Sequence, residues 1–289
     1  MKKLNIDGVM NDKVTRYYFR DLMAHTQIET GKWSIEDVFN SNELLGIFKA
    51  KVLNNRKIFP EDKTMANNIE RAIALGGKGY AKFPTQFPMQ AAVEVYRKYN
   101  INNIVYDFSC GWGIRLMGAL RFGLKYYGTD PNYVLCERLQ DLYETWRDNI
   151  NSKVQEPKIY TQGSEINIPE LENKVGLAFS SPPYFSLEDY KIGNQSYKPG
   201  MNYNDWVNNY LYPTLKNIYS YLIDGGILAI NIKDTTVPLV KSVELIAEEL
   251  GFKFIEVLPL KNIKRLKSTG GLTDTTDEGI YIYRKLNIY

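Results

Sequence analysis

The sequence predicts an α/β protein: a doubly wound, mostly parallel sheet with a helical extension at its N-terminus. Two observations indicate this fold. From Met89 onward, short apolar runs alternate with helical patterns, whereas the first eighty or so residues show helical patterns only. We therefore expect a mainly helical region over residues 1–82, which could take part in substrate recognition, and a sheet domain over 83–289.

The composition excludes several classes of protein. With 289 residues, 44% of them hydrophobic, the chain can bury a core without disulfides or metal ions. Two cysteines, Cys110 and Cys136, exclude a disulfide scaffold, and the single histidine, His25, argues against histidine-based catalysis and metal sites. No apolar run reaches membrane-spanning length and Met1 precedes no signal-peptide core, so we expect a cytoplasmic protein. A net charge of +3 permits nucleic-acid binding only through a local basic patch.

The helical region contains a clear helix start. Ser34 and Asp37 can cap a helix, and apolar residues follow at helical spacing, so the segment 34–55 predicts one helix. Pro60 would stop its continuation. The glycines and prolines of 76–88 predict a loop that leads into the sheet domain.

Helices and strands alternate through the sheet domain. The predicted helices span 89–99, 114–123, 131–149, 205–226 and 240–252, with Pro131 in a favoured first turn. The predicted strands span 104–108, 125–130, 158–165, 175–180, 226–232, 252–260 and 278–285. Ligands bind beyond the carboxyl ends of the strands in such sheets, so chemistry is expected at the polar residues found there. These are Asp107, Asp130, Ser164 with Glu165, and Ser180 with Ser181.

The turn from Asp107 to Gly113 (Asp-Phe-Ser-Cys-Gly-Trp-Gly) joins a predicted strand to a helix. Its glycines, Gly111 and Gly113, let the backbone turn tightly and approach a ligand. Asp130 ends the next strand, at the spacing where nucleotide-binding sheets place a carboxylate for ribose hydroxyls. Leu116 replaces the third glycine of a dinucleotide fingerprint, so a nucleoside without a pyrophosphate is expected. The alternative is a tight turn with a capping aspartate.

Ser181-Pro182-Pro183-Tyr184 directly follows a predicted buried strand and is the most specific signal in the chain. Two consecutive prolines fix two φ angles and make a stiff ledge. On such a ledge, the Ser181 hydroxyl and the Pro182 carbonyl could accept both hydrogens of an exocyclic amino group and free its lone pair for reaction. Tyr184 could stack on the base that carries this group. The alternative is a proline-stiffened surface turn.

Together these motifs resemble the S-adenosylmethionine-dependent DNA amino-methyltransferases, whose fold is the Rossmann-like class I methyltransferase fold. Ser181 to Tyr184 resembles their [D/N/S]-P-P-[Y/F] motif, and the serine form is typical of enzymes that make N4-methylcytosine. The resemblance covers about residues 83–285 and lacks a large target-recognition insert; Trp112 is bulkier than the residue usual between the glycines. By this resemblance the segment 83–90 would hold the methionine end of the cofactor. The remaining cofactor-binding residues that it implies are Asp107, Phe108, Ser109, Gly111, Gly113, Asp130, Ser164 and Glu165.

The resemblance implies a DNA methyltransferase of the kind found in restriction–modification systems, most readily acting on cytosine N4, with S-adenosylmethionine as cofactor and DNA as partner. A base within a duplex would be flipped out. Phosphate contacts are expected from basic residues in two loops, namely Lys191, Lys198, Lys261, Lys264, Arg265 and Lys267. Methylation of adenine N6, of RNA or of a protein amide, and a catalytically silent binding module, remain alternatives. All transferase interpretations require Gly111 and Tyr184 to face one crevice.

Overall fold

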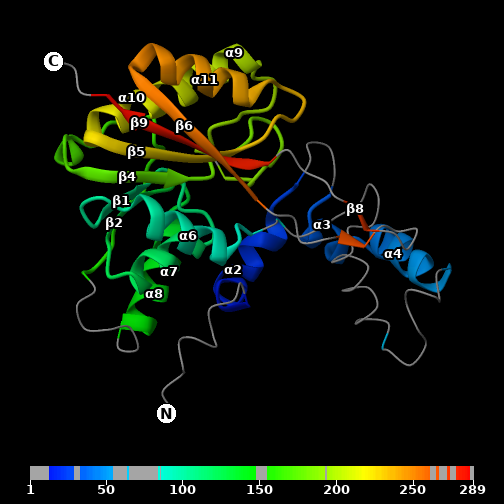
Figure 1. The fold of residues 1–289 in the computed structure, drawn as a ribbon. Coiled ribbons are helices and arrows are strands. Elements are labelled where there is room, and N and C mark those ends of the chain that lie inside the picture. Colours follow the sequence, from blue (N-terminus) through cyan, green and yellow to red (C-terminus); the bar gives the residue numbers. More distant parts are fainter. Residues whose placement is uncertain are drawn as a thin grey trace.

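A seven-stranded sheet forms the centre of the computed structural model, which describes residues 13–28, 33–54, 64, 84, 86–147, 155–192, 194–260, 265–266, 272–273 and 278–286. Its strand order is β3-β2-β1-β4-β5-β9-β6 (Figure 1). The strands are β1 (Ile104–Asp107), β2 (Lys125–Thr129), β3 (Lys158–Tyr160), β4 (Val175–Ser180), β5 (Leu222–Ile232), β6 (Phe252–Pro259) and β9 (Gly279–Lys285). Within this sheet β1 to β5 pair in parallel, and β9 runs antiparallel to both β5 and β6.

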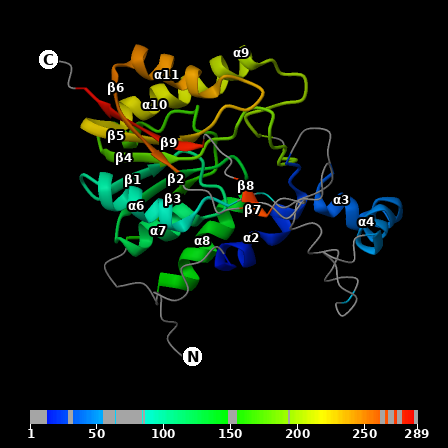
Figure 2. The same ribbon diagram turned by 45° about the vertical axis from the view of Figure 1, so that its right-hand side comes forward.

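Helices cover both faces of the sheet, which confirms the predicted doubly wound fold (Figures 1 and 2). One face is covered by α2 (Lys13–His25), α6 (Met89–Tyr99), α7 (Ile114–Arg121) and α8 (Tyr133–Arg147). The other face is covered by α9 (Tyr203–Trp206), α10 (Tyr212–Tyr221) and α11 (Leu239–Leu250). Each layer buries its own apolar cluster against the sheet, as a two-sided α/β fold requires. The strand order reverses between β1 and β4, which is where such folds open a ligand crevice.

The predicted helix over 34–55 is two helices, α3 (Ile35–Asn40) and α4 (Asn42–Asn54). Ser41 separates them because its backbone is extended and its hydroxyl accepts a hydrogen bond from the Leu44 amide at 3.3 Å. The capping box predicted at the start of α3 is confirmed: Ser34 and Asp37 each accept a bond from the other's backbone amide. Pro60 and most of the predicted loop over 76–88 lie outside the described residues.

Helix α2 belongs to the core that covers the sheet. Phe19 and Met23 are buried in the same cluster as residues of α6, α7 and α8. Arg138 of α8 pairs with Asp21 of α2 through both of its terminal nitrogens. The first part of the chain is therefore attached to the sheet domain by burial and charge, and the division at residue 82 stays a prediction.

Several predicted boundaries differ from those of the structure. The helix predicted over 205–226 contains a π-helical turn (Val207–Leu211) before Pro213, which lacks an amide hydrogen, and it ends at Tyr221. The residues after Tyr221 enter β5 through an irregularity in its pairing with β4. Helix α8 starts at Tyr133 and is capped by Asn132, so Pro131 precedes the helix. The third strand ends at Tyr160, short of the predicted residue 165.

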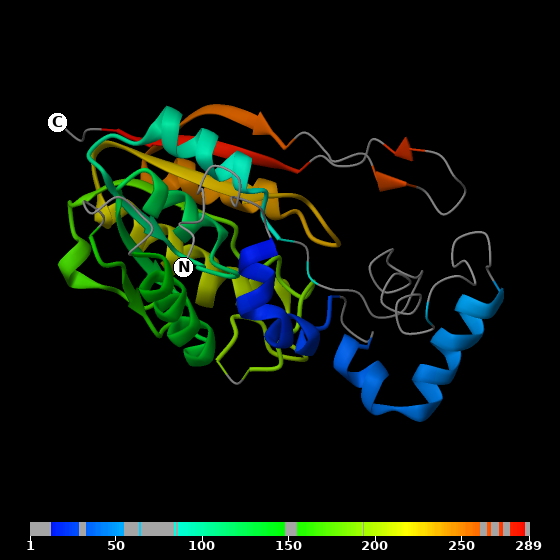
Figure 3. The ribbon, with the colours of Figure 1, turned by 90° about the horizontal axis from the view of Figure 1, so that it is seen from below.

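Two short strands lie between the predicted strands over 252–260 and 278–285. β7 (Arg265–Leu266) pairs antiparallel with β8 (Leu272–Thr273). Figure 3 shows this pair beyond the ends of β6 and β9, on the side of the molecule where α3 and α4 lie.

We predict that Gly113→Ala destabilises the protein more than Gly123→Ala. Both glycines have positive φ, of 74° and 67°, so both variants carry a strain of about 1–2 kcal/mol. A Cβ at Gly113 would also lie 2.9 Å from the Leu139 side chain, whereas one at Gly123 would meet nothing within 4 Å. Crowding should therefore lower the free energy of unfolding by about 1–3 kcal/mol more in Gly113→Ala, as measured by chemical denaturation. Equal losses would contradict the close packing of α7 on α8.

Candidate functional site

One cavity of about 870 Å³ opens beyond the carboxyl ends of the central strands. Gly111 and Tyr184 both line it, so the two predicted motifs face a single crevice, as the transferase interpretation requires. The other predicted site residues that line it are Phe108, Ser109, Asp130, Ser164, Glu165, Ser181, Pro182, Pro183 and Lys191. Its volume lies within the range of small-molecule sites.

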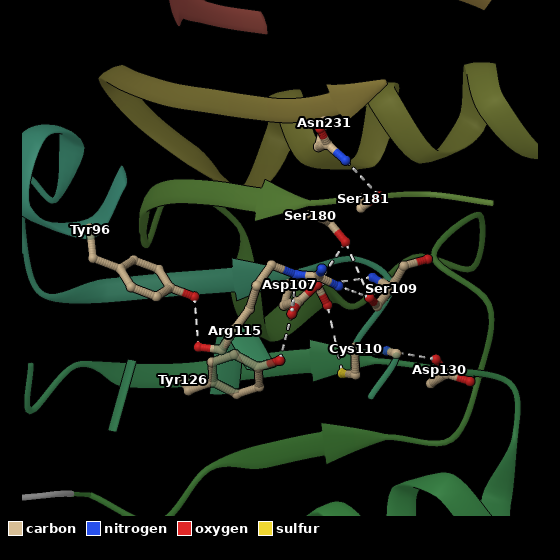
Figure 4. A network of polar contacts seen from close by, with 11 residues as sticks. Tyr96, Asp107, Ser109, Cys110, Arg115, Tyr126, Asp130, Ser180, Ser181 and Asn231 are labelled. Carbon is tan, nitrogen blue, oxygen red and sulfur yellow. Dashed lines mark hydrogen bonds and ion pairs between the residues drawn. The ribbon is translucent and has the colours of Figure 1, made fainter. Parts of the chain in front are cut away.

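Asp107 does not line this cavity, and its role in cofactor contact stays a prediction. Its carboxylate is buried and accepts hydrogen bonds from Arg115 at 2.9 Å, Tyr126 at 2.8 Å and Ser180 at 2.7 Å (Figure 4). It also accepts a bond from the backbone amide of Ser109 at 3.3 Å. Asp107 therefore holds the turn in place from behind. Gly113 also lies away from the cavity, packed against α8.

Arg115 is the partner of Asp107 that sequence reasoning missed. Its side chain is 5% exposed, and it also donates to the carbonyl of Ser109. Burial opposes its charge, but the adjacent Asp107 carboxylate raises the pKa of Arg115 above its ordinary value. A charged residue in the otherwise apolar first turn of the predicted helix was the available signal, because a buried arginine requires a buried anion.

Asp130 does line the cavity, next to the glycine turn. It accepts hydrogen bonds from the backbone amides of Gly111 at 3.3 Å and Asn132 at 3.1 Å. Burial raises the pKa of Asp130 to about 6, although these two bonds lower it. Gly111 has a φ of 51°, so a glycine suits this position beside the carboxylate. The result is an anionic acceptor in a confined space.

Ser164 and Glu165 differ in what they can offer a ligand. The hydroxyl of Ser164 is buried and lies 2.9 Å from the hydroxyl of Thr214, so it is already engaged. The Oε2 atom of Glu165 is buried and has no hydrogen-bond partner among the described residues. Burial raises the pKa of Glu165. Of the two predicted residues, Glu165 therefore has the free acceptor.

The ledge from Ser181 to Tyr184 forms another wall of the cavity. The Ser181 hydroxyl accepts a hydrogen bond from Asn231 at 3.1 Å, and no described residue donates to the Pro182 carbonyl. The hydroxyl of Tyr184 lies 3.2 Å from both the Asn231 carbonyl and Glu278. Asn231, Glu278 and Lys233 were not predicted; the signal for the first was a single asparagine within the apolar run of β5, where it is 2% exposed.

The N-terminal region closes one side of the cavity. Its residues Leu22, His25, Thr26 and Ile28 are among the lining side chains. The segment after α2 pairs with the loop after the ledge through two backbone bonds of 2.9 Å between Gln27 and Asp189. The predicted substrate-binding region therefore touches the site.

The predicted phosphate-binding residues have different positions. Lys191 forms an ion pair with Asp37 at 2.9 Å, so its charge is balanced by a carboxylate of the same chain. Although burial raises the pKa of Asp37, the hydrogen bonds from Lys191 and Ser34 lower it to about 2. Lys198 is exposed and does not line the cavity, and Arg265 lies in β7. Lys261, Lys264 and Lys267 lie outside the described residues.

Trp112, the bulky residue between the two glycines, also lines the cavity. Its ring lies 6.2 Å from that of Phe19 in α2 and 6.3 Å from that of Tyr190 in the loop after the ledge. Trp112 therefore joins the glycine turn to the two segments that close the cavity. Its size suits this contact.

Comparisons with known proteins return fold-level likenesses. No family model and no curated protein matches the chain. An S-adenosylmethionine-dependent O-methyltransferase from Thermotoga maritima is 11% identical to this chain and has a TM-score of 0.48. The match covers 71% of this chain and 68% of the Thermotoga protein. A magnesium protoporphyrin IX methyltransferase from Synechocystis with bound SAM is 13% identical over 87% and 95%, with a TM-score of 0.45. An rRNA methylase from Streptococcus thermophilus is 16% identical over 69% and 94%, with a TM-score of 0.43.

Similarity at this level does not specify a reaction, so the chemistry of the site has to come from its own residues. Among the described residues, no group of three or more histidine, cysteine, aspartate and glutamate side chains is arranged to hold a metal ion. In the same part of the chain, no helix combines the length and apolarity needed to cross a bilayer.

We predict that Asp130→Asn stabilises the protein at pH 8 and does so less at pH 4. Because burial raises the pKa of Asp130 from 3.8 to about 6, the folded state resists ionisation, and stability falls as the pH rises between these two values. Asparagine removes this loss, worth up to about 3 kcal/mol at pH 8. Denaturant unfolding at both pH values measures it, with Asp141→Asn on the exposed face of α8 as control. A pH-independent difference would contradict the raised pKa.

Proposed function

We propose that this protein is an S-adenosylmethionine-dependent methyltransferase that modifies an exocyclic amino group of a DNA base, with cytosine N4 as the favoured acceptor. One observation carries the proposal: a single cavity is lined both by the glycine turn with Asp130 and by the ledge from Ser181 to Tyr184. A methyl transfer needs the donor and the acceptor in one water-excluding crevice, within reach of direct attack.

The first half of the cavity suits a nucleoside cofactor. The carboxylate of Asp130 offers two oxygens for two vicinal ribose hydroxyls, and the absence of a side chain at Gly111 permits close approach. The free Oε2 of Glu165 could accept a hydrogen bond from the amino group of an adenine ring. A buried amide oxygen of Gln86, also without a partner among the described residues, lies at the end of the cavity nearest the N-terminal region. S-adenosylmethionine bound in this half of the cavity would supply an electrophilic methyl group.

The second half suits an amino group attached to a planar ring. The lone pair of such an amine is delocalised into the ring, so acceptors at its two hydrogens favour the reactive geometry and stabilise the positive charge that develops. Ser181 and the Pro182 carbonyl, held by the two prolines, would act as these acceptors. The ring of Tyr184 lines the same wall and could stack on the base.

The choice of DNA and of cytosine rests on the resemblance of Ser181 to Tyr184 to the amino-methyltransferase motif. DNA phosphates would be contacted by the exposed Lys198 and by Arg265 with its neighbours Lys261, Lys264 and Lys267, rather than by Lys191, which is paired with Asp37. A target base would have to leave the duplex to reach the ledge.

Mass spectrometry of nucleosides tests the substrate. We expect N4-methylcytosine in DNA from cells that express the protein, and far less of it in cells that express Ser181→Ala. N6-methyladenine instead of N4-methylcytosine would show that the target base is adenine. New methylation confined to RNA or protein would contradict the DNA proposal. Calorimetry with S-adenosylmethionine separates an enzyme from a silent module, since a module with no cofactor site gives no heat of binding.

We predict that Ser181→Ala and Asp130→Ala affect different steps. Ser181→Ala removes an acceptor for the substrate amine, so kcat should fall by ~100-fold while the Kd of S-adenosylmethionine changes less than ~2-fold. Asp130→Ala removes the ribose acceptor, so this Kd should rise by at least ~10-fold. Equal losses of cofactor affinity in both variants would contradict the division of the cavity into two halves.

A further inference from the structure

A set of polar residues beside the ledge also lines the cavity, at the ends of β5 and β9. Asn231 lies at the end of β5, Lys233 directly follows that strand, and Glu278 directly precedes β9. The Glu278 carboxylate accepts two hydrogen bonds of 3.1 Å: its Oε1 atom accepts one from the Asn231 side chain, and its Oε2 atom accepts one from Lys233. The Asn231 side-chain nitrogen also lies 3.1 Å from the Ser181 hydroxyl and 3.0 Å from the Tyr184 hydroxyl.

The hydroxyl hydrogen of Tyr184 is directed away from Ser181. Tyr184 has one such hydrogen and two acceptors at 3.2 Å, namely Oε1 of Glu278 and the carbonyl of Asn231, neither of which can donate. Burial and the negative charge of Glu278 raise the pKa of Tyr184 well above its ordinary value, so this hydrogen is retained. Towards Ser181, at 3.4 Å, the Tyr184 oxygen can therefore only accept.

This arrangement determines what Ser181 can do. The Tyr184 oxygen, 3.4 Å away, can accept the hydroxyl hydrogen of Ser181, and one lone pair of Ser181 accepts a hydrogen bond from the side-chain nitrogen of Asn231. The second lone pair is then available to a substrate amine, which is the role that the proposed reaction gives to Ser181. If the hydroxyl hydrogen pointed into the cavity, it would compete with the amine hydrogens.

We propose that Glu278 is a positioning residue for methyl transfer: through Tyr184 and Asn231 it keeps the Ser181 hydroxyl oriented as an acceptor for the substrate amino group. The inference rests on the proposed function. Glu278 itself need not touch the substrate, and its influence should pass through Ser181.

Substitution by glutamine gives a specific expectation because of Lys233. An amide has one acceptor oxygen, so in Glu278→Gln it cannot serve both Lys233 on one side and Asn231 with Tyr184 on the other. If the glutamine oxygen turns to Lys233, the glutamine nitrogen faces the side-chain nitrogen of Asn231. Both nitrogens are donors, so the hydrogen bond between the two residues is lost. We expect kcat to fall by ~10-fold, with the Kd of S-adenosylhomocysteine unchanged within ~2-fold. In the Lys233→Met background the oxygen is free to face Asn231, so the same substitution should cost less than ~3-fold.

A double-mutant cycle with Ser181→Ala tests whether Glu278 acts through Ser181. The measurements are kcat, and the calorimetric affinity for deoxycytidine in the presence of S-adenosylhomocysteine, for the wild type, Glu278→Gln, Ser181→Ala and the double variant. We expect the glutamine substitution to lower both quantities in the wild type and neither in the Ser181→Ala background. Glu256→Gln, which breaks an exposed ion pair of β6 with Lys98, is the matched control and should change neither.

The outcomes separate the positioning role from the proposed function. Multiplicative losses in the double variant, or no rescue by Lys233→Met, would overturn the role of Glu278 while leaving methyl transfer intact. A wild-type protein that binds S-adenosylhomocysteine but neither binds deoxycytidine nor methylates any nucleic acid would overturn both. Unfolding temperatures within ~2 °C of the wild type show that a loss of kcat does not come from unfolding.

Discussion

The arrangement of the site depends on a single buried carboxylate, that of Asp107. It lies at the end of β1 and binds one residue from each neighbouring element: Arg115 from α7, Tyr126 from β2 and Ser180 from β4 (Figure 4). A buried charge is costly unless it is paired and fully hydrogen-bonded, and here it is both. Because each of these bonds requires its element in place, the carboxylate fixes three parts of the fold relative to one another.

This interaction also relates the two halves of the cavity. Ser180 donates to Asp107 at 2.7 Å and lies 3.2 Å from the Ser109 carbonyl of the glycine turn, and the next residue along the chain is Ser181. The turn that would hold the cofactor and the ledge that would hold the amine are therefore joined by a direct contact. Reactions that depend on positioning require this kind of rigidity, since small displacements between the reacting groups cost much of the rate.

The N-terminal region completes the crevice through contacts of a different kind. The backbone pairing of Gln27 with Asp189 and the ion pair of Lys191 with Asp37 join it to the loop after the ledge. These contacts are more exposed than the Asp107 network, and surface ion pairs stabilise a fold only weakly. The rigid side of the cavity is thus built into the sheet, while the loop after the ledge is joined to the N-terminal region by a backbone bridge, by the ion pair of Lys191 with Asp37 and, through Tyr190, by the packing of Trp112 on Phe19.

Apolar periodicity, glycines and prolines act locally, so they predicted the sheet, the order of most elements, and the two motifs that face the cavity. Asp130 and Ser181 were predicted from their places after strand ends and line the cavity; Glu165 lines it too, although the strand before it ends at Tyr160. Three features came from the folded structure alone: Asp107 lies behind the glycine turn, Lys191 pairs with Asp37, and the Asn231 side chain bonds both Ser181 and Glu278. Each of these features depends on partners that are distant in the chain, such as Asn231 and Glu278. Which residues become partners is set by the packing of strands and helices, so the pairing leaves no periodic or local pattern in a sequence.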